Sequence, residues 1–280
     1  GRAGRSAEAA WPAAVLIAES NCSIRKNYNT VNRLFRLGRG AALAAVACAK
    51  RQQGPKPLYM WFDGEANYAR LGHPDSIRHY VSRLHDMGFT DLVVDVRSIR
   101  GETVDKSDIA PYMGEWEGVT RPEDYDMLGH FIAEGHKRGM RVHGSLNVFA
   151  GGHNYFDRGI IYGEHADWQS LVYTEGRIVP ISRIKSNYNG MLNPANPEVR
   201  EYELAILREF AKKYPDADGI IFDRVRFDNI TSDFSQLSKE AFEAYTGEPA
   251  ADFPGDILRW SQDADGTWSW SPGPLFRKWN

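Results

Sequence analysis

The sequence has little cysteine and no long apolar run. Its 280 residues include only Cys22 and Cys48, both near the N-terminus. Two cysteines in these positions predict neither a disulfide framework nor a cysteine-ligated metal site. The main apolar run of the N-terminal part, residues 41–47, is far too short to span a bilayer.

Strong charge of one sign is also absent. The formal net charge is −3, and lysine and arginine form no long run, so there is no electrostatic footprint for nucleic acid. The eight histidines are scattered without metal-ligand spacing, which predicts no metal and no cofactor. No glycine-rich loop follows the first predicted strand, so nucleotide binding is disfavoured. Acids and neutral polar groups must supply the chemistry.

Two parts of the chain differ in composition. Residues 1–57 are rich in Ala, Arg and Gly, and they predict a signal-like N-terminal segment and linker without a folded core. Within them, "VNRLFRLGRGAALAAVACAK" (31–50) places basic residues and an apolar run before Cys48, as in a bacterial lipoprotein signal. This predicts membrane attachment through lipidated Cys48, with residues 1–30 outside the natural protein. A chance Ala-rich segment or upstream translated region is the alternative.

Residues 58–280 alternate between strand and helix signals. Apolar segments predict strands at 58–62, 90–97, 140–150 and 218–222, and amphipathic segments predict helices at 74–87, 125–138, 193–215 and 235–245. About forty residues after residue 150 are irregular and rich in aromatics, which is typical of functional loops. Residues 263–274 predict a surface turn.

Successive strand–helix units predict an α/β fold with a parallel sheet. Polar residues follow the apolar strands, which favours a (β/α)8 TIM barrel over a doubly wound sheet, because barrel chemistry gathers at that rim. Only about half of the eight strands are present. Residues 58–280 are therefore predicted to be a partial barrel, the N-terminal half to two-thirds.

The ends of these strands carry the candidate catalytic residues. Asp223 directly follows the apolar strand "GIIF", where burial would raise the pKa of a carboxyl group, so it is the best candidate acid/base. Asp95 is the second candidate. Glycoside hydrolysis needs two such carboxyl groups, one protonated and one ionised. The structural alternative is that Asp223 forms a salt bridge with Arg224 or Arg97.

Other polar and aromatic residues are expected to bind substrate at the same rim. Sugar rings stack on aromatic side chains, while amide, imidazole, carboxylate and guanidinium groups bind sugar hydroxyls. The predicted substrate-binding residues are Trp61, Asp63, Arg97, His143, Asn147, Tyr188 and Arg224.

Several stretches together resemble a known family. They are "MWFDGEANYARL" (60–71), "GFTDLVVDVRSIRGE" (88–102), "KSDIAPYMGEWEG" (106–118), "HKRGMRVHGSLNVFAGGHNYFDRG" (136–159), "MLNPANPEVREY" (191–202) and "DGIIFDRVRFD" (218–228). The chain is similar to the bacterial glycosyl-hydrolase-like proteins classed as family 10 glycosyl hydrolases. The resemblance implies a TIM barrel that cleaves glycans in a secreted or lipid-anchored envelope protein. It matches Asp223 to the acid/base at the fourth strand and places the nucleophile beyond Asn280, so this stretch alone would be inactive.

Three functions remain open on sequence alone. The leading hypothesis is a glycosidase that cleaves O-glycosidic bonds of a poly- or oligosaccharide. The second is a non-catalytic carbohydrate-binding or envelope-scaffold barrel. The third is a metal-assisted hydrolase or deacetylase that uses His143, His153 and Asp95.

Overall fold

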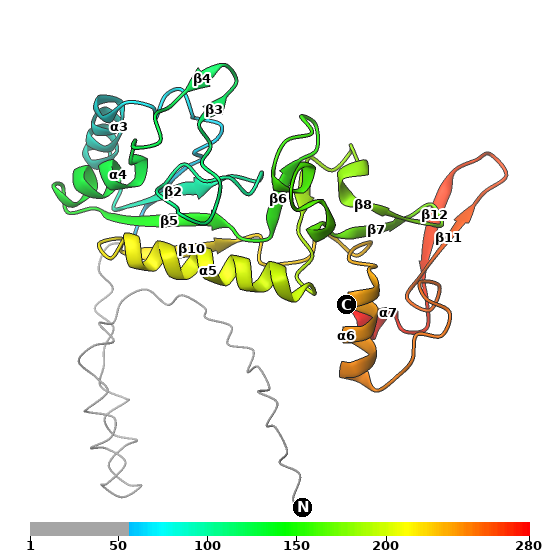
Figure 1. The fold of residues 1–280 in the computed structure, drawn as a ribbon. Coiled ribbons are helices and arrows are strands. Elements are labelled where there is room, and N and C mark those ends of the chain that lie inside the picture. The colour runs from blue at the N-terminus through cyan, green and yellow to red at the C-terminus, as the bar shows by residue number, and fades with distance from the viewer. Residues whose placement is uncertain (1–55) are drawn as a thin grey trace, which may run out of the picture. The chain divides into compact units, whose positions relative to one another are not determined.

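Four parallel strands form the central sheet, in the order β1 (Tyr59–Phe62), β2 (Asp91–Arg97), β5 (Arg141–Asn147) and β10 (Gly219–Asp223) (Figure 1). The computed structural model describes residues 56–280. In the ladder, Tyr59 pairs with Asp91, and both Val93 and Gly219 pair with His143. The α/β fold predicted from the sequence is thus present.

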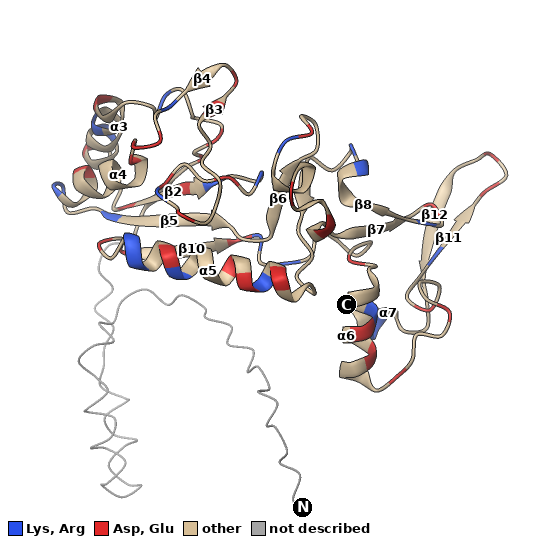
Figure 2. Cartoon of the chain, viewed as in Figure 1, with Lys and Arg blue, Asp and Glu red and all other residues tan. Residues whose placement is uncertain are grey.

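Three helices follow the first three strands and bury one face of the sheet. They are α3 (Pro74–Asp86), α4 (Met127–His136) and α5 (Pro197–Lys213). The side chain of Asn196 accepts a hydrogen bond from Glu198 N at 2.9 Å and Pro197 starts α5, as the sequence predicted. Along α5, acidic and basic residues lie at successive positions (Figure 2), while its apolar residues enter the core.

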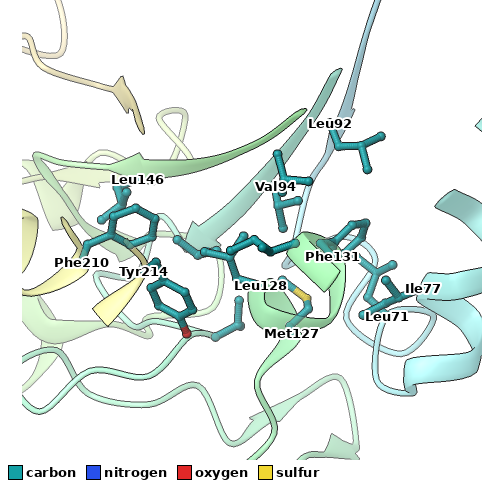
Figure 3. Close-up of a cluster of buried hydrophobic side chains, with 14 of the residues drawn as sticks. Leu71, Ile77, Leu92, Val94, Met127, Leu128, Phe131, Leu146, Phe210 and Tyr214 are labelled. Carbon is teal, nitrogen blue, oxygen red and sulfur yellow. The ribbon is translucent and has the colours of Figure 1, made fainter. Parts of the chain in front are cut away.

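The main core lies between these helices and the sheet. Figure 3 shows Leu92 and Val94 of β2 and Leu146 of β5 beside side chains of the helices. Helix α5 packs tightly here, because a Cβ atom at Gly144 would lie 2.3 Å from the Phe210 ring. Burial of so many apolar groups is the main stabilising term of this unit.

Strand alternation sends different residues to the two faces. Met60, Phe62 and Ile220 pack against the core, whereas Trp61 is 48% exposed and so faces away from it. Asp95 alternates with the core residue Val94 and lies on the face opposite the helices. That face collects polar and aromatic side chains.

The predicted irregular region contains short regular elements. It holds the two-stranded sheets β6 (Ala150–His153) with β9 (Asn189–Met191) and β7 (Leu171–Thr174) with β8 (Arg177–Pro180), and the 3-10 helices η2 (Ile160–Tyr162), η3 (Ala166–Trp168) and η4 (Ile181–Arg183). A further hairpin precedes α4, with β3 (Glu115–Trp116) and β4 (Val119–Thr120). These elements pack around a second apolar cluster that includes Trp168 and Ile181.

The C-terminal part differs from the prediction. Helix α6 (Gln236–Thr246) ends at Gly247, as expected. The predicted turn at 263–274, however, belongs to a hairpin of β11 (Leu258–Gln262) and β12 (Trp268–Pro272), which is followed by α7 (Phe276–Trp279). Tryptophans and serines alternate along β12, and this period of two is a strand signal that the turn residues "DADG" obscured.

The four-stranded sheet is open within residues 56–280. Strands β1 and β10 each pair with one strand only, so no closed barrel is seen in the described residues. On β10, Phe222 is 54% exposed although it points to the helix side. The proposed lipoprotein signal and Cys48 lie outside the described residues. None of the helices in 56–280 has the length and apolarity needed to cross a membrane.

Candidate functional site

A cleft of about 580 Å³ opens at the carboxyl ends of the four strands. Side chains at this end converge because parallel strands all finish at the same edge of their sheet. Seven of the nine residues predicted from sequence line it, namely Trp61, Asp63, Asp95, Asn147, Tyr188, Asp223 and Arg224. Acidic and basic positions lie next to each other at the ends of β2 and β10 (Figure 2).

Asp63 forms the turn that follows β1. Its Oδ1 accepts hydrogen bonds from Glu65 N at 3.0 Å and Ala66 N at 2.8 Å. The turn lies against β2, since a Cβ atom at Gly64 would be 2.2 Å from the carbonyl oxygen of Asp95. Glycine is required by this close approach. The contact fixes the Asp63 turn beside Asp95.

Asp95 is a half-buried carboxyl group near the end of β2. Burial raises its pKa to about 6, and the negative charges of Asp63 and Asp223 act in the same direction. Hydrogen bonding by Ser145 and Trp61 opposes this rise, although Oδ1 of Asp95 has no hydrogen bond of normal geometry within the described residues. Asp95 therefore carries a carboxyl group that stays partly protonated near neutral pH.

Glu65 is a second such carboxyl group, and sequence reasoning missed it. It lines the cleft two residues after Asp63. Burial raises the pKa of Glu65 to about 7, against the opposing charge of Arg100. The only sequence signal for it was its place in the stretch "MWFDGEANYARL", directly after a strand-terminal acid.

Asn147, Arg224 and Tyr188 form a hydrogen-bonded clamp across the cleft. Arg224 Nε donates to Asn147 Oδ1 at 2.8 Å, and Arg224 Nη2 donates to Tyr188 Oη at 2.7 Å. Arg224 has a φ of 54°, an uncommon value for a residue other than glycine. Its amide donates to Asp223 Oδ1 at 2.7 Å, so this conformation ties the clamp to Asp223.

Arg97 is a predicted substrate-binding residue that does not line the cleft. It is 1% exposed, and Nη2 donates to Glu203 Oε1 on α5 at 2.8 Å. Nη1 donates to the carbonyl oxygens of Asn147 at 3.0 Å and Val148 at 2.7 Å. An irregular register between Asp95 and Arg97 interrupts the alternation that would have placed both on one face. Arg97 thus holds the end of β5 in place.

His143 also lies away from the cleft. It precedes Asn147 by four residues on β5, toward the opposite end of the sheet, and its Nε2 lies 2.9 Å from Oδ1 of the buried Asp91. Thr90 and Arg141 also donate to Asp91, at 2.6 and 2.9 Å to Oδ2. His143 belongs to this buried polar cluster and not to the group of cleft residues.

Residues from loops and hairpins complete the cleft. Sequence reasoning assigned no substrate-binding role to the lining residues Glu65, Ala66, Ser98, Ile99, Val104, Trp116, Glu117 and His153, and Phe156 also lines the cleft. The rings of Trp116 and Phe156 meet edge to face at 5.4 Å, and the buried Arg100 lies 4.5 Å from the Trp116 ring centroid. These segments have no periodicity that could place them beforehand.

The metal-assisted alternative has no geometric support in residues 56–280. No three His, Cys, Asp or Glu side chains there gather as a metal-binding group. His153 lines the cleft, whereas His143 contacts Asp91 at the other end of the sheet. The three residues of that hypothesis do not form one site.

The fold and cleft define an α/β protein with an acidic, aromatic-lined site at the strand ends. Residues 60–267 match the family model described as glycosyl hydrolase-like 10, which covers most of the chain. The chain therefore belongs to this family, and the resemblance stated from the sequence is confirmed. Membership supports a carbohydrate-related role.

A curated relative and two solved structures are also similar. The chain is 28% identical over 237 residues to an S-layer-related protein of Niallia circulans, and the match covers 80% of the chain but 14% of that relative. A hypothetical protein from Ruminiclostridium thermocellum is 22% identical, with a TM-score of 0.43 over 71% of this chain and 93% of that one. An alpha-L-fucosidase from Paenibacillus thiaminolyticus is 15% identical, with a TM-score of 0.49 over 70% of this chain and 27% of that one.

Proposed function

We propose that the chain is the glycan-binding and catalytic part of a glycoside hydrolase that acts on a poly- or oligosaccharide. The observation that carries this proposal is the meeting of Asp95 and Asp223 in one cleft, in a member of the glycosyl hydrolase-like 10 family. The charge of Asp223 contributes to the raised pKa of Asp95, so the two carboxyl groups interact across the cleft. Glycosidases use such a pair on either side of the scissile bond.

Asp95 is assigned as the proton donor. Its raised pKa keeps a proton available near neutral pH, which is what a general acid requires. Asp223 accepts a hydrogen bond from the amide of Arg224, an arrangement that suits an ionised carboxylate. This assignment reverses the order favoured from sequence, where Asp223 was the first candidate for acid/base. Glu65 is the second protonated carboxyl group within the cleft.

The aromatic side chains of the cleft supply the binding surface. Trp61 is 48% exposed and Tyr188 is 43% exposed, although both lie in the cleft lining. Exposed aromatic faces can stack on the C–H faces of sugar rings, while the Asn147 and Arg224 clamp can bind hydroxyl groups. This combination suits an uncharged ring flanked by hydroxyls.

The open sheet is proposed to be part of a larger (β/α)8 barrel. Within residues 56–280, strand β10 has an unpaired edge, and the exposed Phe222 lies on its helix-facing side. Unpaired strand edges are normally covered or paired in folded proteins. Further strands of the same polypeptide would pair with β10, and the matched share of the S-layer-related relative, 14%, leaves room for them.

A cell-envelope or extracellular location is proposed from the same relative. Attachment through lipidated Cys48 remains a prediction from sequence. A non-catalytic envelope-scaffold role is the second candidate, and the S-layer-related relative is the observation that favours it.

The test compares the chain with its Asp95→Asn and Asp223→Asn variants on a panel of purified glycans. Product release is measured by chromatography, and binding is measured by calorimetry. Catalysis predicts that both variants lose about 100-fold or more of the cleavage rate while glycan binding persists. Binding without cleavage, both by the unaltered chain and by the longer polypeptide proposed above, would support the scaffold role. Cleavage unchanged in both variants would refute the assignment of these acids.

A further inference from the structure

A second cavity, of about 350 Å³, is lined by none of the residues that line the cleft. Four chain segments form it, namely β7, the stretch after η4, the loop after β10 and strand β11. Its volume lies within the range of sites that bind small molecules. The lining residues that bear on its chemistry are Asn187, Asp228, Asn229, Thr231 and Trp260.

Hydrogen bonds between these segments hold the walls of the second cavity. Tyr173 N donates to Thr231 O at 2.8 Å, which joins β7 to the loop after β10. Trp260 Nε1 donates to Tyr173 O at 3.1 Å, so the indole ring of β11 is fixed against β7. Thr231 N donates to Asn229 Oδ1 at 2.7 Å within the loop. The cavity is therefore formed by the fold itself, as binding sites usually are.

Asp228 and Asn187 present hydrogen-bond acceptors in this cavity. Asn187 Nδ2 donates to Asp228 Oδ2 at 2.6 Å, and Asn229 Nδ2 donates to the same oxygen at 2.8 Å. These bonds fix the carboxylate and the Asn187 amide together. Within residues 56–280, neither Oδ1 of Asp228 nor Oδ1 of Asn187 accepts a hydrogen bond. Both oxygens are therefore free to accept hydrogen bonds from a ligand.

The combination of an indole ring with these acceptors matches a sugar ring. A sugar has an apolar C–H face that stacks on an aromatic side chain, and hydroxyl groups that donate hydrogen bonds. An anionic ligand would meet the carboxylate of Asp228. A point cation requires several oxygens around one centre, and residues 56–280 contain no group of three or more candidate metal ligands.

Two chain segments link the second cavity to the cleft. Tyr188 lines the cleft, and its neighbour Asn187 lines the cavity, with Cα atoms about 3.8 Å apart. Burial raises the pKa of Asp228, while the Asn187 hydrogen bond and the charge of Arg224 oppose this rise. Arg224 lines the cleft, so its charge acts on a residue of the second cavity as well. The two cavities are therefore neighbours.

We propose that the second cavity is a distal sugar-binding subsite, so that the chain prefers glycans long enough to occupy the cleft and this cavity together. The inference rests on the proposed function, because the cleft must bind the same glycan. One sugar ring stacks on Trp260 and donates hydrogen bonds to the Asp228 and Asn187 oxygens. Long glycans gain affinity because the second contact is made within a molecule that is already bound. Short oligosaccharides gain only the cleft contacts.

The experiment measures the binding of β-1,4-linked oligomers of glucose and of N-acetylglucosamine, from disaccharides to octasaccharides, by calorimetry. In a series that binds, we expect the octasaccharide to bind about tenfold more tightly than the tetrasaccharide. An octasaccharide that binds no more tightly than the tetrasaccharide would overturn the inference and leave the proposed function standing. Failure of both series and of the broader glycan panel would refute the proposed function and the inference with it.

Substitution of Asn187 separates the second cavity from the cleft. Asn187→Ala removes an amide that donates to Asp228 and lines the cavity. We expect octasaccharide binding to weaken about fivefold and disaccharide binding to change by less than about twofold. Gln236→Ala is the matched control, because its amide donates to Glu240 Oε1 at 2.9 Å and lines neither cavity. An equal loss at every length, or a loss no greater than that of the control, would contradict the subsite.

A second variant tests stacking. Trp260→Leu removes the aromatic face and keeps an apolar side chain against the C-terminal apolar cluster, which includes Phe234 and Ile257. We expect octasaccharide binding to weaken about tenfold while disaccharide binding is retained, and urea unfolding establishes that the variant is folded. Octasaccharide binding equal to that of the unaltered chain would show that no sugar ring stacks on Trp260.

Discussion

Strand β2 carries two aspartates, one near each end, whose pKa values are shifted in opposite directions. Asp91 begins β2 and Asp95 lies four residues further on, toward the same face. Burial raises the pKa of Asp91, but hydrogen bonds from Arg141, Thr90 and His143 outweigh it and hold the pKa below its usual value. At Asp95 burial prevails. Partners, more than depth in the fold, decide which carboxyl group is structural and which remains available for chemistry.

The largest expected loss of stability comes from removing the charge of Asp91, which pairs with Arg141 and His143. Asp91→Asn keeps the size of the side chain but removes the charge that Arg141 and His143 share. We expect the free energy of unfolding to fall by about 3 kcal/mol, because removing one partner of a buried ion pair leaves the other groups poorly compensated. Urea unfolding measures this.

Two further variants complete that comparison. Asp95→Asn should leave the free energy of unfolding unchanged or slightly increased, since no ion pair is lost. Glu248→Gln removes an exposed pair with Lys278 and should cost less than about 1 kcal/mol. Equal losses of stability for Asp91→Asn and Asp95→Asn would mean that hydrogen-bond partners do not distinguish these two carboxyl groups.

Sequence predicted much of this arrangement because strand ends can be read from apolar runs. Asp63, Asp95 and Asp223 each follow such a run, and parallel pairing brings them to one cleft. The hydrogen-bond partners of these side chains cannot be predicted in that way, because they are distant in the sequence. His143 contacts Asp91, which is 52 residues away in the chain, and Arg97 contacts Glu203, which is 106 away.

The positions of the cleft aromatics Trp116 and Phe156 were harder still to predict from the sequence. Trp116 comes from a hairpin of two-residue strands, and Phe156 comes from a turn after β6. Such short segments carry no period, so their position depends wholly on tertiary packing. Glu65 was missed for a related reason, because its environment is set by Arg100 and Ser98 from another loop.

A second prediction concerns the backbone of the Asp63 turn, which lies against Asp95 in the cleft. Gly64→Ala would place a Cβ atom 2.2 Å from the Asp95 carbonyl oxygen, and backbone atoms cannot move aside easily. We expect a loss of about 2 kcal/mol in the free energy of unfolding, together with weaker glycan binding as the Asp63 turn moves. Gly114→Ala is the control, since its nearest neighbours lie 3.7 Å away on the Tyr112 ring. A loss no greater than that of the control would contradict the close approach.

The third prediction uses pH to distinguish the two ends. The pKa of Asp95 rises from 3.8 to about 6, and that of Glu65 rises from 4.5 to about 7. A group with a raised carboxyl pKa holds its proton more tightly in the fold, so its contribution to stability is lost as pH rises from about 4 to 7. The pKa of Asp91 is lowered, so its contribution to stability has the opposite pH dependence. That contribution is lost as pH falls below the usual aspartate pKa of 3.8.

Unfolding measurements from pH 4 to 8 test this sign. We expect the difference in stability between Asp95→Asn and the unaltered chain to grow in favour of the variant as pH rises, by on the order of 1 kcal/mol. The paired variant Glu65→Gln should behave in the same direction. A difference that is constant across this range would show that Asp95 has no raised pKa.

The smallest effect on the free energy of unfolding is expected from removing the hydroxyl group of Ser145, which lies opposite Asp95 in the sheet. Ser145→Ala removes a buried group without a hydrogen-bond partner, so the free energy of unfolding should change by less than about 0.5 kcal/mol. In contrast, Ser238→Ala removes a hydroxyl that donates to the buried Asp233 Oδ2 at 2.7 Å, and it should cost about 1 kcal/mol or more. Because Ser145 lowers the pKa of Asp95, its loss should raise that pKa further in a carboxyl NMR titration. A fall in the pKa would show that Ser145 does not stabilise the charged form of Asp95, and a stability loss equal to that of Ser238→Ala would show that the Ser145 hydroxyl group makes a full hydrogen bond within the fold.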